Sequence, residues 1–204
     1  MSESNPNDPS VRERLLRAAV DLFTTRGYAA TSVREIVEHG GVTKPVLYYH
    51  FGSKEGLYLE ILGNVEREFD EAISRPLPAG RARERIRHLF EAIFTRFEAN
   101  LSLVRFVNTV FWGPPQGAPA FDLDSIHLRL REIVRALVEA GIASGELRPS
   151  DPGDVTIALV GVLSFSMDIQ LVHPEWGNGR EGFLRILDII FAGLAAAPQQ
   201  EIPA

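Results

Sequence analysis

Hydrogen-bond donors gather in one short segment of this 204-residue chain, between residues 43 and 54. An ammonium group can donate to guanine O6 and N7, and an apolar side chain can contact a thymine methyl group. Phenol, imidazole and ammonium groups also donate to phosphate oxygens, which positions a protein on DNA without encoding sequence. The segment therefore has the chemistry of a surface that binds nucleic acid. Its donors are Lys44, Tyr48, Tyr49, His50 and Lys54.

The chain as a whole is acidic, so a local group of basic and donor residues is informative about its partners. The chain has 27 Asp+Glu against 21 Lys+Arg, a formal net charge of −6, so it has no bulk attraction for phosphate or for anionic lipid. An anionic partner must be bound by a local patch. Lys44 and Lys54 are the two lysines of the sequence, whereas all other basic residues apart from histidine are arginines.

Local sequence signals predict the helices that hold these donors. Ser32 and Glu35 form a capping-box pattern that predicts a short helix over residues 33–39, which two glycines end. Thr43 is placed to cap a second short helix over residues 44–51. Two short helices joined by a glycine-containing turn and preceded by a longer helix are typical of a helix-turn-helix.

Apolar residues recur at helical spacing along most of the chain, without the alternation of strands, which predicts an all-α fold. The Pro- and Gly-containing residues 76–80 indicate a boundary. We therefore expect a three-helix DNA-binding domain, a connecting segment, and a helical domain for ligand binding and dimerisation. The expected limits are residues 9–56, 57–80 and 81–196.

The first 60 residues resemble the TetR family of transcriptional regulators. The matching residues are Arg14-Leu15-Leu16, Ala18-Ala19, Leu22-Phe23, Arg26-Gly27-Tyr28, Thr31 to Ile36, Gly41 to Lys44, Leu47 to Phe51 and Ser53 to Glu55. The resemblance implies a homodimer that places two recognition helices in successive major grooves of double-stranded operator DNA. It implies base-edge or groove contacts for Arg34, Lys44, Pro45 and Val46, and backbone contacts for Thr43, Tyr48, Tyr49, His50 and Lys54.

The last two expected helices, over residues 154–172 and 180–194, are apolar on nearly all sides. A helix of this kind must be covered all round. We expect the two helices from each of two chains to form a four-helix bundle, although burial inside one protomer is the alternative. The predicted interface residues are Val155, Leu159, Val162, Phe165, Phe183, Leu187, Ile190, Phe191 and Leu194.

Aromatic side chains are frequent between these two regions, and small-molecule pockets are mostly apolar with a few orienting polar groups. We expect an apolar or aromatic effector of unknown identity, although a polar residue of this kind is more often a core or surface residue than a ligand contact. The pocket candidates are His88, Phe90, Phe94, Phe97, Asn108, Phe111, Trp112, His127, Ser164 and Asp168.

Several functional classes find no support in the sequence. Cysteine is absent, which excludes disulfides and thiolate chemistry, and the five histidines show no paired metal-binding spacing. The first residues are polar, and the uncharged run over residues 155–167 is short for a membrane span. We therefore expect a cytoplasmic protein that is not an enzyme, with no cofactor, metal or membrane partner.

The hypothesis that unites these observations is a dimeric repressor that an effector releases from its operator. An activator or a ligand-independent regulator of the same fold would have the same sequence features. A helical ligand carrier or enzyme without DNA binding is a more remote alternative, because it does not require the donors at residues 43–54.

Overall fold

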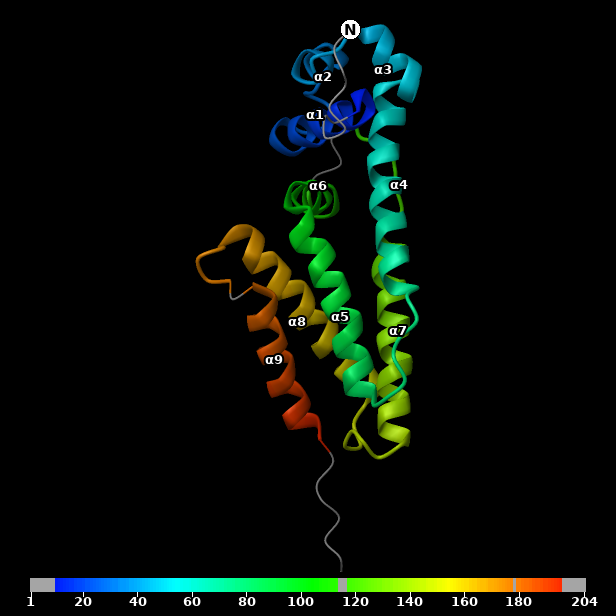
Figure 1. Ribbon diagram of the computed structural model, residues 1–204, viewed down its shortest axis with the longest axis vertical. Helices are drawn as coiled ribbons and strands as arrows, with labels where there is room; N and C mark the ends of the chain where they lie inside the picture. Colours follow the sequence, from blue (N-terminus) through cyan, green and yellow to red (C-terminus); the bar gives the residue numbers. More distant parts are fainter. Residues whose placement is uncertain (1–9, 114–116, 178, 196–204) are drawn as a thin grey trace, which may run out of the picture. The chain divides into compact units, whose positions relative to one another are not determined.

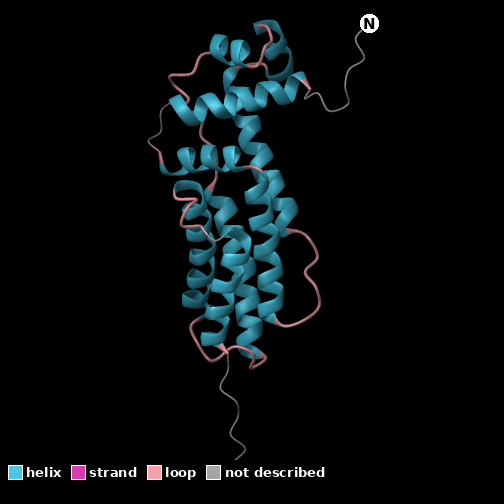
Figure 2. Cartoon of the chain, turned by 60° about the vertical axis from the view of Figure 1, so that its left-hand side comes forward, coloured by secondary structure: helices cyan, strands magenta, loops and turns pink. Residues whose placement is uncertain are grey.

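A computed structural model describes residues 10–113, 117–177 and 179–195 (Figure 1). All regular elements in these ranges are α-helices, which confirms the predicted all-α class (Figure 2). The outer limits of the predicted domains, residues 9 and 196, lie outside the described residues. The helices are α1 (Val11–Arg26), α2 (Val33–His39), α3 (Lys44–Phe51), α4 (Lys54–Ile73), α5 (Ala82–Ala99), α6 (Leu101–Trp112), α7 (Asp124–Ala143), α8 (Pro152–Val172) and α9 (Gly179–Leu194).

The described residues form two compact units, and the division falls within α4. The first unit contains residues up to 68 together with residues 100–123, and the second contains residues 69–99 and those from 124 onward. The helix α6 therefore belongs with the N-terminal helices, although the sequence places it after α5.

Aromatic packing explains why α6 joins the first unit. The ring of Phe106 on α6 is buried and lies 6.2 Å from the ring centroid of Phe23 on α1 and 5.6 Å from that of Tyr58 on α4. Tyr28 completes the group, because its ring centroid lies 5.5 Å from that of Phe23 and 4.9 Å from that of Tyr58. We call Phe23, Tyr28, Tyr58 and Phe106 the aromatic cluster.

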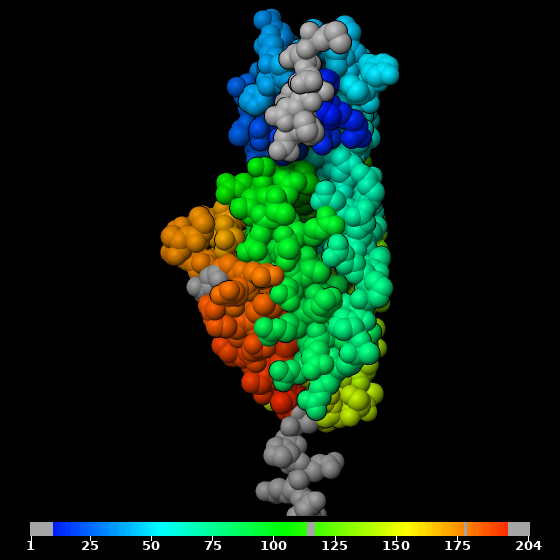
Figure 3. Space-filling model, viewed as in Figure 1, coloured from blue at the N-terminus to red at the C-terminus, as the bar shows by residue number. Residues whose placement is uncertain are grey.

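The second unit has its own aromatic core. Phe94 on α5 stacks on Phe183 of α9 with ring centroids 5.1 Å apart, and Phe90 and Phe97 extend the group. The helix α9 packs beside α5 and α8 and lies at the surface that faces the viewer in Figure 3, in orange and red. Burial of large rings supplies much of the stability of a core of this kind.

The turn between α7 and α8 holds together segments that are distant in sequence. The Glu146 carboxylate accepts hydrogen bonds from the backbone N–H groups of Ala82 (2.7 Å) and Arg83 (3.2 Å) and so caps the start of α5. The backbone N–H of Arg148 donates to the carbonyl of Leu194 at the end of α9 (2.8 Å). Charged caps at a helix N-terminus satisfy backbone donors that have no partner within the helix.

The helix α8 is apolar on every side, as predicted, but only part of its surface is buried. It packs against α5, α7 and α9, and leaves Ile157 and Phe165 exposed. Among the described helices, α8 alone has the length and apolar composition that could cross a membrane. Core helices share these properties, so they do not by themselves indicate a membrane.

Candidate nucleic-acid interface

The predicted helix-turn-helix is present, and its local signals act as expected. Ser32 and Glu35 form the capping box, in which the Ser32 hydroxyl accepts from the backbone N–H of Glu35 (3.2 Å) and the Glu35 carboxylate accepts from that of Ser32 (2.8 Å). The bond from the Ser32 backbone N–H, and a further one that the Ser32 hydroxyl donates to the same carboxylate (2.8 Å), lower the pKa of Glu35. In the turn, Gly41 has a φ of +63°, a conformation that side chains disfavour.

The recognition helix α3 turns one side inward and the other to solvent. Leu47 and Phe51 are buried, and Ile36 of α2 is buried in the same unit. The opposite side exposes Tyr49, 85% of which is accessible, and Tyr48. An exposed large aromatic side chain is an informative departure from ordinary surface composition.

The N-terminal end of α3 is open to a partner. Thr43, Lys44 and Pro45 are exposed, and Val46 is half-buried. Thr43 stands at the N-cap position, but its side chain makes no capping hydrogen bond, contrary to the expectation that it caps the helix. The Thr43 hydroxyl and the Lys44 ammonium lie at the start of α3, and their contact with DNA remains a prediction.

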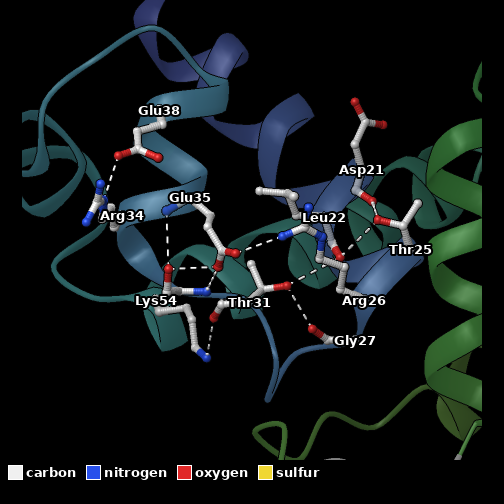
Figure 4. Close-up of polar contacts among 11 residues, drawn as sticks. Asp21, Leu22, Thr25, Arg26, Gly27, Thr31, Arg34, Glu35, Glu38 and Lys54 are labelled. Atoms are coloured by element: carbon white, nitrogen blue, oxygen red, sulfur yellow. Dashed lines mark hydrogen bonds and ion pairs between the residues drawn. The ribbon is translucent and has the colours of Figure 1, made fainter.

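Arg34 on α2 is exposed, but its guanidinium has a partner in the protein. Its Nε donates to Oε1 of Glu38, one turn along the helix, at 2.7 Å (Figure 4). The hydrogen bond and the charge of Glu38 raise the pKa of Arg34. Glu38 is not among the predicted site residues, although opposite charges at i and i+4 are the sequence signal for such a pair.

Lys54, a predicted phosphate contact, has backbone carbonyls as its partners in the protein, whereas Arg34 has a carboxylate. Its ammonium is half-buried and donates to the backbone carbonyls of Tyr28 and Thr31, both at 2.9 Å (the Thr31 contact is drawn in Figure 4). The nitrogen also lies 4.0 Å from the centroid of the Tyr28 ring. Burial lowers the pKa of Lys54. Its contact with phosphate remains a prediction.

Known proteins match both the helix-turn-helix and most of the chain. The family model described as "Bacterial regulatory proteins, tetR family" matches residues 15–61, which contain α2 and α3 entirely. The transcriptional repressor KstR2 of Mycolicibacterium smegmatis is 30% identical over 190 residues, which cover 86% of this chain and 84% of that protein. The chain belongs to the tetR family.

A second relative and a solved structure also resemble this chain. The transcriptional activator FasR of Mycolicibacterium smegmatis is 43% identical over 91 residues, 43% of this chain and 40% of that protein. The solved structure of the TetR-family regulator PfmR from Thermus thermophilus has a TM-score of 0.72 and 27% identity, covering 93% of this chain and all of that one. This tetR-family chain is accordingly a transcriptional regulator of the helix-turn-helix class.

The predicted effector residues of this tetR-family regulator lie in different surroundings. Phe90, Phe94 and Phe97 are buried in the aromatic core of the second unit. Asn108 and Phe111 are half-buried on α6 of the first unit, and Asp168 is half-buried on α8. The exposed candidates are His88, Trp112, His127 and Ser164. Their shared role in one pocket remains a prediction.

The predicted dimer residues divide between the inside and the outside of the protomer. Phe165 is exposed, whereas Val162, Ile190 and Leu194 are half-buried. The other five are buried in the protomer itself, so their side chains are already covered without a second chain. These buried residues are Val155, Leu159, Phe183, Leu187 and Phe191.

Release of Arg34 from its ion pair provides a test of the interface. We expect Glu38→Gln to raise operator affinity about two- to fivefold, because it frees the guanidinium and removes a carboxylate that repels phosphate. Fluorescence anisotropy with labelled duplex measures the effect. The matched control is Glu139→Gln, since Glu139 pairs with Arg135 at the same i, i+4 spacing on α7 (2.9 Å). An equal gain in the control, or the same gain in an Arg34→Ala background, would contradict a role for Arg34 at the DNA.

Proposed function

We propose that the chain is a cytoplasmic, homodimeric repressor that places its two α3 helices in successive major grooves of an operator. A small apolar or aromatic effector would favour a dimer whose recognition helices are spaced wrongly for grooves about 34–36 Å apart. The observation that carries the proposal is the exposed N-terminal end of α3 beside exposed Tyr48 and Tyr49. Its work is binding and not catalysis, in keeping with relatives that are transcriptional regulators.

The α3 helix divides its contacts between bases and backbone. Lys44 is the residue we assign to a guanine edge, because it is exposed in the first turn, and Val46 and Pro45 supply apolar contacts for thymine methyl groups. Tyr48, Tyr49 and half-buried His50 reach flanking phosphates from later positions. These contacts fix the register of the protein on the duplex.

An exposed strip on α8 supports dimerisation through the last two helices. Ile157, Gly161 and Phe165 are spaced four residues apart along one helix side, Ala158 lies three residues before Gly161, and all four residues are exposed. Small residues such as Ala158 and Gly161 let two helices approach closely. We call these four residues the α8 strip. Ile189 on the adjoining α9 is exposed as well and would extend an apolar contact between two chains.

The aromatic core of the second unit supports an apolar effector. Rings already packed beside one another provide apolar walls, and half-buried Asp168 on α8 is a polar group that can orient a ligand. An effector of this kind would be recognised chiefly by burial of its apolar surface.

The test begins with the DNA. Duplexes of about 30 bp with randomised sequence, long enough for two half-sites, are selected on the purified chain, and the enriched site is footprinted. A two-fold symmetric site with half-sites one helical turn apart is the expected result. Loss of any sequence enrichment would contradict operator binding. A reporter placed behind the selected site then gives the sign of regulation, and expression that rises when the gene for this chain is deleted indicates repression.

Activation is the second candidate, and one observation favours it. The 91-residue match to the activator FasR is closer in identity than the longer match to the repressor KstR2. Reporter expression that falls on deletion of the gene would establish activation. If neither a cellular extract nor a small-molecule library changes reporter expression, the result would favour regulation without a ligand.

A further inference from the structure

We propose that Lys54 is a positioning residue, whose ammonium ties the loop between α1 and α2 to the first turn of α4 and so sets the helix-turn-helix for specific DNA binding. The inference rests on the DNA-binding role proposed above. It differs from the phosphate contact predicted for Lys54, because here the side chain acts through the protein backbone.

The Lys54 ammonium makes three contacts within the protein, with two backbone carbonyls and one aromatic ring. Both carbonyl acceptors, those of Tyr28 and Thr31, belong to the loop that joins α1 to α2, while Lys54 is the first residue of α4. The Tyr28 ring lies 4.0 Å from the nitrogen, within the range of a cation–π contact. One charged group thus bridges segments 23 and 26 positions apart.

The loop that Lys54 holds also sets where α2 begins. Thr31 is only 2% exposed, and its hydroxyl donates to the carbonyl of Gly27 at 2.8 Å. The next residue, Ser32, is the N-cap of α2. A shift of the Thr31 backbone would therefore displace the start of α2, and α3 with it, because the turn between the two helices is short.

The other side of the loop rests on the aromatic cluster. The Tyr28 ring packs against Phe23 of α1 and Tyr58 of α4, both of which are buried. The Lys54 ammonium lies against this same ring. Two sets of contacts therefore hold the loop in place: the packing of the Tyr28 ring and the hydrogen bonds from Lys54 to the loop carbonyls.

The shape of an ammonium suits this place better than a guanidinium. Lysine presents three donors from one compact nitrogen, whereas arginine presents a planar fork matched to carboxylate and phosphate. Two carbonyls and a ring around one nitrogen suit the ammonium. Arginine is nevertheless the basic residue that this chain uses nearly everywhere else. We call the contacts of the Lys54 ammonium with the two carbonyls and the Tyr28 ring the clamp. The two roles can be separated, because arginine would preserve a phosphate contact but not the clamp.

The experiment compares variants on two labelled duplexes, the site selected on the wild-type chain and a scrambled duplex of the same composition. We expect Lys54→Met, Lys54→Arg and Tyr28→Leu each to lower affinity for the selected site about tenfold, the loss of one strong contact, and affinity for the scrambled duplex much less. The double variant Lys54→Met with Tyr28→Leu should be no weaker than either single one. Tyr28→Phe, which keeps the ring, is the control and should bind like the wild type.

Specific outcomes would overturn the proposal. Wild-type binding by Lys54→Arg, or an equal loss on both duplexes in Lys54→Met with a flatter salt dependence, would assign the side chain to phosphate instead. A variant that loses thermal stability but keeps the ratio of the two affinities would have only a structural role.

Amide hydrogen exchange gives a second measurement, independent of DNA. Tyr28→Leu should speed exchange of the backbone N–H groups over residues 31–36 relative to Tyr28→Phe, and unchanged protection would contradict the clamp. If the wild-type chain selects no duplex, operator binding fails as a proposal, while exchange still decides on the clamp.

Discussion

A Phe165→Asp substitution is expected to leave a folded protomer that no longer dimerises and that binds its operator at least about a hundredfold more weakly, because two linked half-site contacts become independent. Phe165 is 64% exposed, so its replacement removes little packing within the protomer. In the proposed interface the new carboxylate would be buried without a partner, which is strongly unfavourable. Analytical ultracentrifugation measures the association state, and anisotropy measures the affinity.

The control for this substitution is Leu128→Asp on α7. Leu128 is another exposed apolar residue of the same unit, 54% accessible, and lies outside the α8 strip. It should remain dimeric and bind DNA normally. A dimeric Phe165→Asp protein with unchanged affinity would remove α8 from the interface, whereas dissociation of both variants would place the contact elsewhere on the unit.

Lys44→Ala has the second large expected effect. A good contact between a side chain and a base edge contributes about 1–3 kcal/mol. A dimer would lose this contact in both half-sites, so operator affinity should fall about thirtyfold or more. Because Lys44 reads a base edge, repeat selection on the variant should show relaxed preference at one position of each half-site.

An exposed arginine on the second unit controls for the loss of charge. Arg131→Ala removes the same charge from α7 and should leave both affinity and base preference unchanged. A Lys44→Ala protein that binds all duplexes more weakly by one common factor would show a phosphate contact. Unchanged binding would remove Lys44 from the interface altogether.

The helix-turn-helix could be predicted from sequence because its signals are local. The capping box of Ser32 and Glu35, the glycines of the turn and the apolar positions Ile36 and Leu47 each act within a few residues. The positions of α2 and α3 follow from these signals, and the comparisons confirm the family that they indicate.

The partners of charged side chains were harder to predict, since they depend on distant segments. Nothing near Lys54 in sequence shows that its ammonium meets the carbonyls of a loop more than twenty residues earlier. The position of α6 has a similar cause, because it depends on contacts of Phe106 with α1 and α4.

The outward side of α8 could not be predicted for a different reason. A helix that is apolar all round contains no pattern that separates inside from outside. Val155 and Leu159 therefore looked equivalent to Phe165, and only the packing of α5, α7 and α9 distinguishes them.

The turn between α7 and α8 has a practical consequence for anyone who labels or splits this protein. It is exposed around Gly145 and resembles the loop tips where tags and inserted domains are usually tolerated. However, Glu146 holds the start of α5 and Arg148 holds the end of α9. An insertion there would loosen both helices at once, so a reporter domain or cleavage site is better placed elsewhere in the chain.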